Sequence, residues 1–374
     1  MKLLIGGDFS PQHRVGYSIE KGDYSCFENL KPIINQADYS ILNLESPVVV
    51  GEATPIQKTG PALSTTINAI KCIKDAGFSC ITLANNHLRD YGAKGIEDTI
   101  KQCEAYGLDY VGAGINLQEA KRIHNIVIGD RKVSIINVCE SEWSVANNFR
   151  GGSNPYNIVN LYNDIISSRK DGSDYVVVIV HGGIEHYPYP TPRMKEDYHF
   201  LIDVGADLVV NHHQHCISGY EIYKERFIFY GIGNLCFDSN VKTRTPWNEG
   251  FLVMIDFDNS YSFTLYPYVQ CINDGKVHLV DNDDSLHERI QELSKVIEDQ
   301  DMLFNQFNNY SELGGKERML MLEPYSNRAL QYLFKKGFLP RILSEKWDRL
   351  ALNLFRCESH REVILEYLEN SIKK

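Results

Sequence analysis

Metal-binding side chains occur in five short segments of this sequence. Asp8 and Glu45 supply carboxylates, Asn86 supplies a carboxamide oxygen, and His181 and the segment His213–His215 supply imidazoles. These donors suit Mn, Fe, Zn or Mg, whereas nothing indicates a thiolate site. Two divalent ions roughly 3.5–4 Å apart, bridged by a carboxylate such as Glu45, would polarise a phosphoryl or carbonyl oxygen and activate a water molecule. The residue types therefore predict a metal-dependent hydrolase with two divalent ions as cofactors.

Each of these segments follows a short apolar run that predicts a β-strand. The runs cover residues 2–5, 39–44, 80–83, 175–180 and 208–210. Helical spacing of apolar residues between several of the runs indicates an α/β protein. Ligands of open α/β sheets bind beyond the carboxyl ends of the strands, so we expect the five segments to meet there. A hairpin over 126–136 and a meander over 251–269 add strands, and an Asn- and Gly-rich loop over 147–155 is expected to be mobile.

The character of the sequence changes at about residue 285. Amphipathic helices are predicted from there on, over residues 286–297, 320–334, 343–355 and 363–372. None of them carries a cluster of catalytic residue types. We therefore predict a domain over residues 1–280 that contains the site, followed by a helical C-terminal region over 281–374 that covers the sheet or contacts a partner.

Composition limits the partners and the compartment. The net charge of −11 leaves no basic surface for nucleic acid, and an anionic small-molecule, glycan or polymer substrate would need positive charge supplied locally, for example by metal ions. No apolar run approaches the roughly 18–20 residues of a membrane span, and the first residues are too short a run for a signal peptide. The nine cysteines show no paired spacing, which favours reduced thiols and a cytoplasmic protein without membrane insertion. Nothing in the sequence indicates the oligomeric state.

Six motifs, in order, resemble those of the CapA proteins, the capsule and poly-γ-glutamate biosynthesis branch of the calcineurin-like metallophosphoesterases. They are Gly-Asp at 7–8, Asn-Leu-Glu-Ser-Pro at 43–47, Leu-Ala-Asn-Asn-His-Leu-Arg-Asp-Tyr-Gly at 83–92, and the segments 181–186, 211–215 and 230–238. The resemblance spans about residues 1–260. It implies a four-layer α/β/β/α metallophosphoesterase sandwich with a dinuclear centre, to which the predicted helices add a C-terminal appendage.

The resemblance also implies how the ligands divide between two ions. One ion would take Asp8, Glu45 and His215, and the other would take Glu45, Asn86, His181 and His213. Ser10 stands where a histidine ligand is usual in the superfamily, which makes the first ion the less secure of the two. Three further positions depart from the usual pattern without removing a ligand, and they leave the substrate preference open: Gly182, Asn211 and Gln214.

Residues beside the ligands are candidates for catalysis. His87 follows Asn86 and can serve as a general acid or bind substrate oxygens. Asp90 can orient His87 or bind the backbone. His213 and His215 alternate, so in a strand they would face the same side, and His212 would face the other. Without the motif context, Asp8 could equally be a cap and the Asn86-His87 segment a turn.

Three residues are predicted to bind substrate: Arg14, Glu185 and Asn234. Arg14, like Arg89, offers positive charge for an anionic group, although an exposed arginine without such a role is the more common case. For Glu185 and Asn234 a purely structural role is equally open. The proline-rich run at 187–192 forms either a stiff wall of the site or simply a rigid loop.

These observations lead to a first functional hypothesis with two alternatives. The first is a phosphoesterase-like metal hydrolase, a phosphomonoesterase or phosphodiesterase, in capsule, exopolysaccharide or poly-γ-glutamate metabolism. The first alternative is a non-catalytic factor that binds polymer or assembles with a synthase. The second keeps the metal centre but cleaves an amide or ester bond. The scissile bond and the identity of the metal lie beyond the sequence, because function resides in the walls of a site rather than in its fold.

Overall fold

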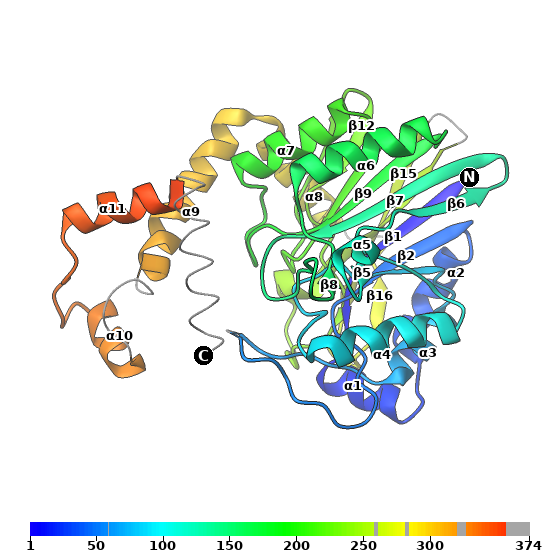
Figure 1. Ribbon diagram of the computed structural model, residues 1–374, viewed down its shortest axis with the longest axis horizontal. Helices are drawn as coiled ribbons and strands as arrows, with labels where there is room; N and C mark the ends of the chain where they lie inside the picture. The colour runs from blue at the N-terminus through cyan, green and yellow to red at the C-terminus, as the bar shows by residue number, and fades with distance from the viewer. Residues whose placement is uncertain (59, 258–260, 281–283, 320–326, 357–374) are drawn as a thin grey trace. The chain divides into compact units, whose positions relative to one another are not determined.

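The computed structural model describes residues 1–58, 60–257, 261–280, 284–319 and 327–356. The chain divides into two compact units, Met1–Phe304 and Asn305–Lys374. The first unit contains two β-sheets and the helices that flank them (Figure 1). The first unit carries all five predicted segments.

One sheet of the first unit is formed around the N-terminal strand. Its order is β16-β15-β14-β1-β2-β3-β4, and β13 also pairs with β1. The strands β1 to β4 run parallel, whereas β14, β15 and β16 are antiparallel. Their bounds are β1 Lys2–Ser10, β2 Tyr39–Leu44, β3 Cys80–Thr82, β4 Asp109–Val111, β13 Asn234–Phe237, β14 Glu249–Asp256, β15 Ser262–Gln270 and β16 Val277–Leu279.

The second sheet has the order β11-β12-β10-β9-β7-β6. At its centre the β-branched run of β9 lies between two parallel neighbours, β7 and β10. The bounds are β6 His124–Ile128, β7 Arg131–Cys139, β9 Tyr175–His181, β10 Leu208–His212, β11 Tyr220–Tyr223 and β12 Arg226–Phe229. A separate two-stranded pair is formed by β5 (Ala113–Gly114) and β8 (Gly152–Ser153).

Helices cover the outer face of each sheet (Figure 1). The first sheet is covered by α1 His13–Glu20, the 3-10 helix η1 Ser25–Leu30, α2 Lys31–Ile34, α3 Ile67–Ala76 and α4 Gly92–Ala105. The second is covered by α6 Ile158–Lys170 and α7 Pro192–Asp203. Two short helical turns lie outside these layers, α5 Leu117–Ala120 and η2 Pro246–Asn248.

Alternation along the strands shows the four layers directly. In β9, Val177 and Ile179 belong to the core between the two sheets, whereas Val178 belongs to the core beneath α6 and α7. In β1, Leu3 faces the other sheet and Leu4 faces the helices. Since successive strand residues point to opposite faces, each sheet is buried on both sides. The layer order is α/β/β/α, which confirms the predicted fold class.

The helix α8 (Asp284–Glu298) belongs to the first unit. Its Leu286, Ile290 and Leu293 join the core between the sheets, and Ser294 accepts a hydrogen bond from the backbone N of Tyr220 at 3.0 Å. The compact unit therefore continues past residue 280 to Phe304. That the part of the chain needed for function ends at residue 280 stays a prediction.

The described part of the second unit contains helices joined by turns and irregular segments. The helix α9 (Gln300–Met319) crosses the division, and α10 (Arg328–Lys335) and α11 (Glu345–Arg356) follow. The predicted helix over 343–355 is confirmed as α11. The predicted helix over 320–334 is found in its second part as α10. Its residues 320–326 and the helix predicted over 363–372 lie outside the described residues.

Candidate metal centre

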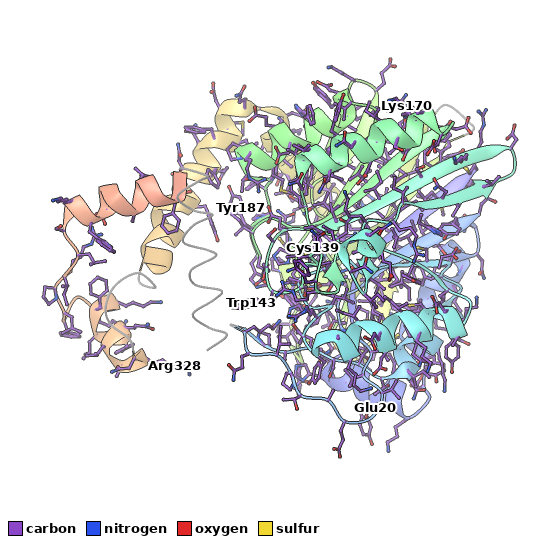
Figure 2. All side chains as sticks on the ribbon, in the orientation of Figure 1. Glu20, Cys139, Trp143, Lys170, Tyr187 and Arg328 are labelled. Atoms are coloured by element: carbon purple, nitrogen blue, oxygen red, sulfur yellow. The ribbon has the colours of Figure 1, made fainter. Side chains whose placement is uncertain are left out.

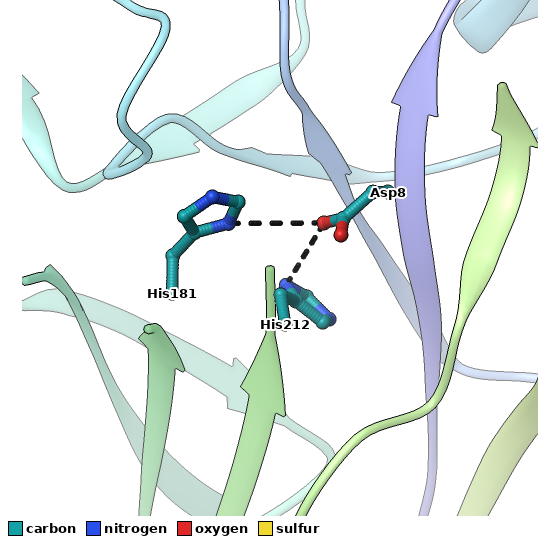
Figure 3. A group of neighbouring side chains, drawn as sticks. All are labelled: Asp8, His181 and His212. Carbon is teal, nitrogen blue, oxygen red and sulfur yellow. Dashed lines mark ion pairs between the residues drawn. The ribbon is translucent and has the colours of Figure 1, made fainter. Parts of the chain in front are cut away.

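The five predicted segments meet between the two sheets of the first unit. Asp8 lies in the last third of β1, Glu45 follows β2 directly, and His181 ends β9 in the facing sheet. Figure 3 shows Asp8 opposite His181 and His212. All these side chains are buried, with Glu45 at 0% exposure. The carboxyl ends of strands from both sheets therefore converge on one group of polar side chains, as the sequence predicts.

Two adjacent glycines bring β1 close enough to place Asp8. A Cβ atom on Gly7 would lie 1.9 Å from the carbonyl oxygen of Gly233, so only glycine fits there. The close approach allows Asp8 to pair with Asn234 in the parallel register of β1 and β13. Asp8 then accepts hydrogen bonds from Asn43 Nδ2 at 2.7 Å and from the backbone N of His213 at 3.1 Å. The carboxylate is held toward the facing sheet.

One set of donors surrounds the His181 Nε2 atom. This atom lies 3.1 Å from Asn86 Oδ1, 3.2 Å from His213 Nδ1 and 3.6 Å from Glu45 Oε1. Ligands about 2.0–2.2 Å from one ion have mutual separations of this size. The four side chains that the resemblance assigns to the second ion are therefore brought together.

The other set is formed by Asp8, Glu45 and His215. His215 Nε2 lies 3.6 Å from Glu45 Oε1, and His215 Nδ1 lies 3.6 Å from Asp8 Oδ2. Glu45 Oε1 thus faces both sets, as a bridging carboxylate must. Ser10 does not replace the usual histidine, because its Oγ lies 2.6 Å from Ser46 Oγ in a buried hydrogen bond.

The electrostatics of the site fit a cation. Both carboxylate oxygens of Glu45 are buried without a hydrogen-bond partner. Burial, and then the charge of Asp8, raise the pKa of Glu45 well above its usual value. Burial also raises the pKa of Asp8 to about 7, against its hydrogen bonds from His213 and Asn43. Burial, followed by the charge of His213, lowers the pKa of His181, so its imidazole is neutral and able to bind metal.

A second group of side chains lies beside the ligands. His87 Nδ1 is 2.6 Å from Asp90 Oδ2, and the backbone N of Leu63 also donates to that oxygen at 2.7 Å. Lys58 forms an ion pair with Asp90, and its Nζ lies 3.2 Å from His87 Nδ1. Asp90 therefore both orients His87 and binds the backbone. Lys58 was not predicted, because a single lysine in a polar loop carries no sequence signal.

The three predicted substrate ligands lie in different surroundings. Asn234 accepts a hydrogen bond on Oδ1 from His215 Nδ1 at 2.8 Å, which leaves His215 Nε2 for a metal. Glu185 is exposed, and a carboxylate oxygen of it groups with nitrogens of His213 and His215. Arg14 donates to Asp238 at 2.7 Å and to the backbone carbonyl of Cys271 at 2.6 Å. A substrate role for Arg14 would break these bonds, so we omit it from the proposal below.

The segment that contains the three histidines departs from strand geometry. β10 ends at His212, and His213 and His215 adopt φ angles of 87° and 54°, in the left-handed region. Strand alternation therefore does not set their directions, and the prediction that His212 faces away from the site is wrong. His212 Nδ1 lies 3.8 Å from Asp8 Oδ1, and burial lowers the pKa of His212 to about 3. Non-glycine residues with positive φ concentrate at functional sites.

Part of the loop predicted to be mobile is held by hydrogen bonds. Ser153 Oγ donates to the carbonyl of Asn85 at 2.7 Å, and Asn154 Nδ2 donates to the carbonyl of Asn137 at 3.0 Å. These contacts and the strand β8 give residues 152–154 a defined structure. The mobility of the loop as a whole stays a prediction.

The four-layer α/β/β/α sandwich thus places carboxylate, carboxamide and imidazole donors between the ends of strands from both sheets. The chain belongs to the family described as the bacterial capsule synthesis protein PGA_cap, whose model matches residues 2–239. The predicted relationship to the CapA proteins is confirmed.

Several known proteins are similar to this chain. The capsule biosynthesis protein CapA of Bacillus anthracis is 35% identical over 223 residues, which cover 58% of this chain and 54% of the relative. The PGA biosynthesis protein CapA of Bacillus subtilis (strain 168) is 32% identical over 225 residues, which cover 59% of this chain and 58% of the relative. The chain thus spans little more than half the length of these curated relatives.

Among solved structures, a novel phosphatase from Mycoplasma pneumoniae is similar with a TM-score of 0.47 and 17% identity, over 74% of this chain and 95% of that chain. A calcineurin-like phosphoesterase from Bacillus subtilis has a TM-score of 0.41 and 12% identity, over 82% of this chain and 98% of that chain. Within the described residues, no helix combines the length and the apolar character that crossing a bilayer requires.

Proposed function

We propose that this chain is a divalent-metal-dependent hydrolase, a phosphomonoesterase or phosphodiesterase, that acts in capsule, exopolysaccharide or poly-γ-glutamate metabolism. The observation that carries the proposal is the buried Glu45 carboxylate, which has no hydrogen-bond partner. It lies 3.6 Å from imidazole nitrogens of both His181 and His215. An unpaired charge is costly in a protein interior, and two cations on either side of Glu45 would remove that cost. The names of the relatives support the assignment to capsule or polyglutamate metabolism.

The donors divide between two positions. The residues that would hold one ion are Asp8, Glu45 and His215, and those that would hold the other are Glu45, Asn86, His181 and His213. Two bound divalent ions would polarise the scissile group and lower the pKa of water into a nucleophilic range. Asn234 keeps His215 in the tautomer that presents Nε2 to Glu45.

His87 is the proposed general acid. Its Nδ1 is held by Asp90, so the ring is fixed and its Nε2 remains for a proton that passes to the leaving group. The Lys58 ammonium group lies against both side chains and is only 5% exposed. It compensates the buried charge of Asp90 and keeps positive charge beside the leaving group.

Metal analysis tests the centre separately from catalysis. The double variant His181→Ala/His213→Ala removes two imidazoles of one ion set, and we expect it to lose at least that ion. The matched control is His124→Ala/His278→Ala, which removes two histidines that bind Tyr39 and Asp274 instead. Elemental analysis after reconstitution with Mn²⁺ gives the stoichiometry. An unchanged metal content in the first double variant would refute the assigned site.

An activity screen separates the three functional hypotheses. Wild-type protein with Mn²⁺ is assayed for phosphate release from sugar phosphates, nucleotides and bis-nitrophenyl phosphate, and for amine release from γ-glutamyl amides. Phosphoester cleavage that His87→Ala reduces by about 10²–10⁴-fold supports the proposal. Amine release alone would favour the amide hydrolase. Full metal loading without turnover of any substrate would favour the non-catalytic binding factor.

The proposal places the activity in the cytoplasm. All eight cysteines in the described part of the chain are buried free thiols, which suits a reducing compartment. Cell fractionation with an antibody to the native protein tests this, and recovery outside the cytoplasm would contradict it.

A further inference from the structure

Two arginines near the metal centre have no acidic partner. Arg89 follows Asn86 by three residues. Arg150 lies in the loop after β7, and the start of that loop is marked by Cys139 and Trp143 in Figure 2. Both are half-buried, and the Nε atom of each is buried without a hydrogen bond. Among the described residues neither guanidinium group forms an ion pair. The guanidinium group of Arg150 donates from Nη2 to the carbonyl of Val145, at 3.2 Å.

Other partly buried arginines of the first unit are paired with carboxylates. Arg14 binds Asp238, Arg169 binds Asp207, and Arg289 binds Glu249. Carboxylates are also abundant, because the chain has 49 acidic residues against 38 basic ones. The lack of an acidic partner at Arg89 and Arg150 is therefore specific to these two residues and does not reflect a shortage of carboxylates in the chain.

The loop that carries Arg150 is fixed to the metal-binding segment. Ser144 Oγ donates to the carbonyl of Asn86 at 2.6 Å and accepts from the backbone N of Arg89 at 3.2 Å. Arg150 and Asn147 exchange backbone hydrogen bonds at 2.9 and 3.3 Å, which closes a tight turn. A Cβ on Gly152 would lie 2.0 Å from the carbonyl oxygen of Ser144, so the turn needs glycine there. These contacts hold both arginines beside Asn86, one of the candidate metal ligands.

Two unpaired guanidinium groups in one place are unfavourable without an anion. The adjacent residues Ser144 and Val145 bind the backbone N of Arg89 and the guanidinium of Arg150, which brings the two arginines together. Burial and then the charge of Arg150 lower the pKa of Arg89. The planar guanidinium fork matches the oxygens of a carboxylate or a phosphate and binds them through two parallel hydrogen bonds. An oxyanion between the two arginines would supply the missing charge and satisfy the buried donors.

Two carboxylates also lie at the centre. Glu142 Oε1 lies 3.7 Å from His213 Nε2, and exposed Glu185 groups with His213 and His215. These carboxylates would repel a second anionic group of a ligand bound there. Such a group is therefore favoured only beside positive charge, which Arg89 and Arg150 offer.

We propose that Arg89 and Arg150 form an oxyanion subsite that binds a second, uncleaved anionic group of the substrate, a carboxylate or a phosphate. The substrate class is then a compound with two anionic groups, one at the metals and one at the arginines. The identity of the ligand as substrate rests on the proposed function. The presence of the subsite does not.

Anion binding to the metal-free protein tests the subsite. Full-length protein, stripped of metal on a chelating resin, is titrated calorimetrically with inorganic phosphate and, separately, with glutarate. We expect at least one of them to bind, and the double variant Arg89→Gln/Arg150→Gln to bind it about 10–100-fold more weakly, because charge-assisted hydrogen bonds are lost. Preference for phosphate or for glutarate tells which oxyanion the subsite takes.

Control variants keep the outcome interpretable. Arg131→Gln, which removes an exposed arginine paired with Asp174, should bind both anions as the wild type does. Arg150→Lys keeps the charge but not the fork, and should give an intermediate affinity. The double variant should also reconstitute with the same amount of Mn²⁺ as the wild type, which shows that it is folded. Equal anion affinity in the double variant and the wild type, or no binding of either anion, overturns the subsite.

The subsite and the proposed function fail in different measurements. If the screen shows no turnover while anion binding depends on the arginines, only the proposed function fails. If turnover is found, the double variant should raise KM about tenfold or more for substrates with a second anionic group and leave substrates without one unchanged. A KM that rises equally for both kinds of substrate overturns the subsite.

Discussion

Two buried carboxylates, Asp238 and Glu45, show that a charge in the protein interior requires a counter-charge. The side chain of Asp238 is 0% exposed, and Arg14 binds it at 2.7 Å. Burial raises the pKa of Asp238, but the hydrogen bonds from Arg14 and Asn240 outweigh it and hold the pKa below its usual value. Glu45 is equally buried and has no hydrogen-bond partner, and burial followed by the charge of Asp8 raises its pKa. The side chains around Glu45 do not supply its counter-charge, which is the strongest argument for a metal at this position.

Replacing Glu45 with glutamine should have opposite effects on the metal-free and metal-loaded protein. A raised carboxyl pKa means that the folded state binds more protons than the unfolded state, so stability falls as pH rises above about 4.3. Glu45→Gln removes this loss, and the metal-free variant should resist urea better than the wild type at pH 8. The wild type should gain about 2.7 kcal/mol at a Mn²⁺ concentration of 100 times Kd, and the variant far less. A variant that is less stable without metal and equally stabilised by Mn²⁺ would contradict the assignment.

Asn234 should control the first ion selectively. Its Oδ1 accepts the hydrogen bond from His215 Nδ1, so Asn234→Ala frees the ring of His215 to rotate or change tautomer. We expect the affinity for the first ion to fall about 10–100-fold, as it does when such outer partners are removed. The residues that would hold the second ion do not include His215, so that position would serve as the internal control in a calorimetric Mn²⁺ titration. An equal loss at both positions would indicate general misfolding instead.

For single residues, the sequence predicts which side chains lie together at the site but not how each side chain is oriented. Asp8, Glu45 and His181 follow β-branched or apolar strand runs, and position at a strand end is a local property. The direction of His212 is predicted wrongly because the alternation is counted from His213 and His215, whose positive φ angles take them out of the strand. As the last residue of β10, His212 shares a face with Leu208 and Val210, which face the other sheet. Lys58 could not be predicted, since only tertiary contacts bring it against Asp90.

The strand β1 positions the site by pairing with three neighbours. Its first half pairs with β14 and β2, and its last residues pair with β13 and β2. The change of partner falls at the glycines before Asp8, where the backbone approaches Gly233. The side chains of Asp8 and Asn234 therefore come from neighbouring strands in register, although 226 residues separate them. A local pattern contains no information on this pairing.

Elements with strong local patterns could be predicted, and the others could not. The run Tyr175–Val180 predicts β9 because five consecutive β-branched residues favour a buried strand. The helix α9 has polar residues around its circumference, so no apolar stripe reveals it. The loop at 147–155 looks flexible by composition, and only the contacts of Ser153 and Asn154 fix part of it.

The ion pair of Arg14 and Asp238 fastens the start of α1 to the end of β13. Arg14→Leu should destabilise the protein by about 2–3 kcal/mol, below the roughly 3–5 kcal/mol of a fully buried pair because Arg14 is 29% exposed. The Asp238 pKa is lowered in the folded state, so the stability it contributes is present above about pH 3.9 and is lost as pH falls through the folded pKa. The difference between variant and wild type in urea unfolding should therefore shrink below about pH 4.

A surface pair provides the comparison. Arg131, 46% exposed, pairs with Asp174 at 3.3 Å. Arg131→Leu should leave the stability almost unchanged, because an ion pair in water contributes little. Equal effects of the two arginine variants at pH 7 would show that the Arg14 pair contributes no more than a surface contact.

At the scale of the whole molecule, the site and its supporting cores lie within one unit. The three cores contain residues from β1 to α8, and all the candidate ligands fall between Asp8 and His215. In the described part of the second unit many large apolar side chains are exposed, among them Tyr332, Phe338, Trp347 and Phe355. None of these side chains belongs to the three cores. Because the candidate ligands and the cores lie in the first unit, the metal chemistry should not depend on the second unit.

Two truncated chains test where the functional part ends. A chain that ends at Phe304 keeps α8 and every core residue of the first unit, so we expect it to unfold cooperatively and to bind as much Mn²⁺ as the full chain. A chain that ends at residue 280 loses four buried aliphatic side chains of α8, Leu286, Ile290, Leu293 and Ile297. At about 1.5–3 kcal/mol each, their loss is comparable with the roughly 5–15 kcal/mol that stabilises a typical domain.

The shorter chain should accordingly be insoluble or lack a cooperative transition in circular dichroism. α8 is amphipathic and follows the last strand. From the sequence alone, such a helix can belong either to a separate appendage or to the core of the first unit. Only the position of its apolar face between the sheets distinguishes the two. If the chain ending at residue 280 folds and binds metal as the longer one does, the boundary predicted from the sequence is the correct one, and α8 is dispensable to the fold.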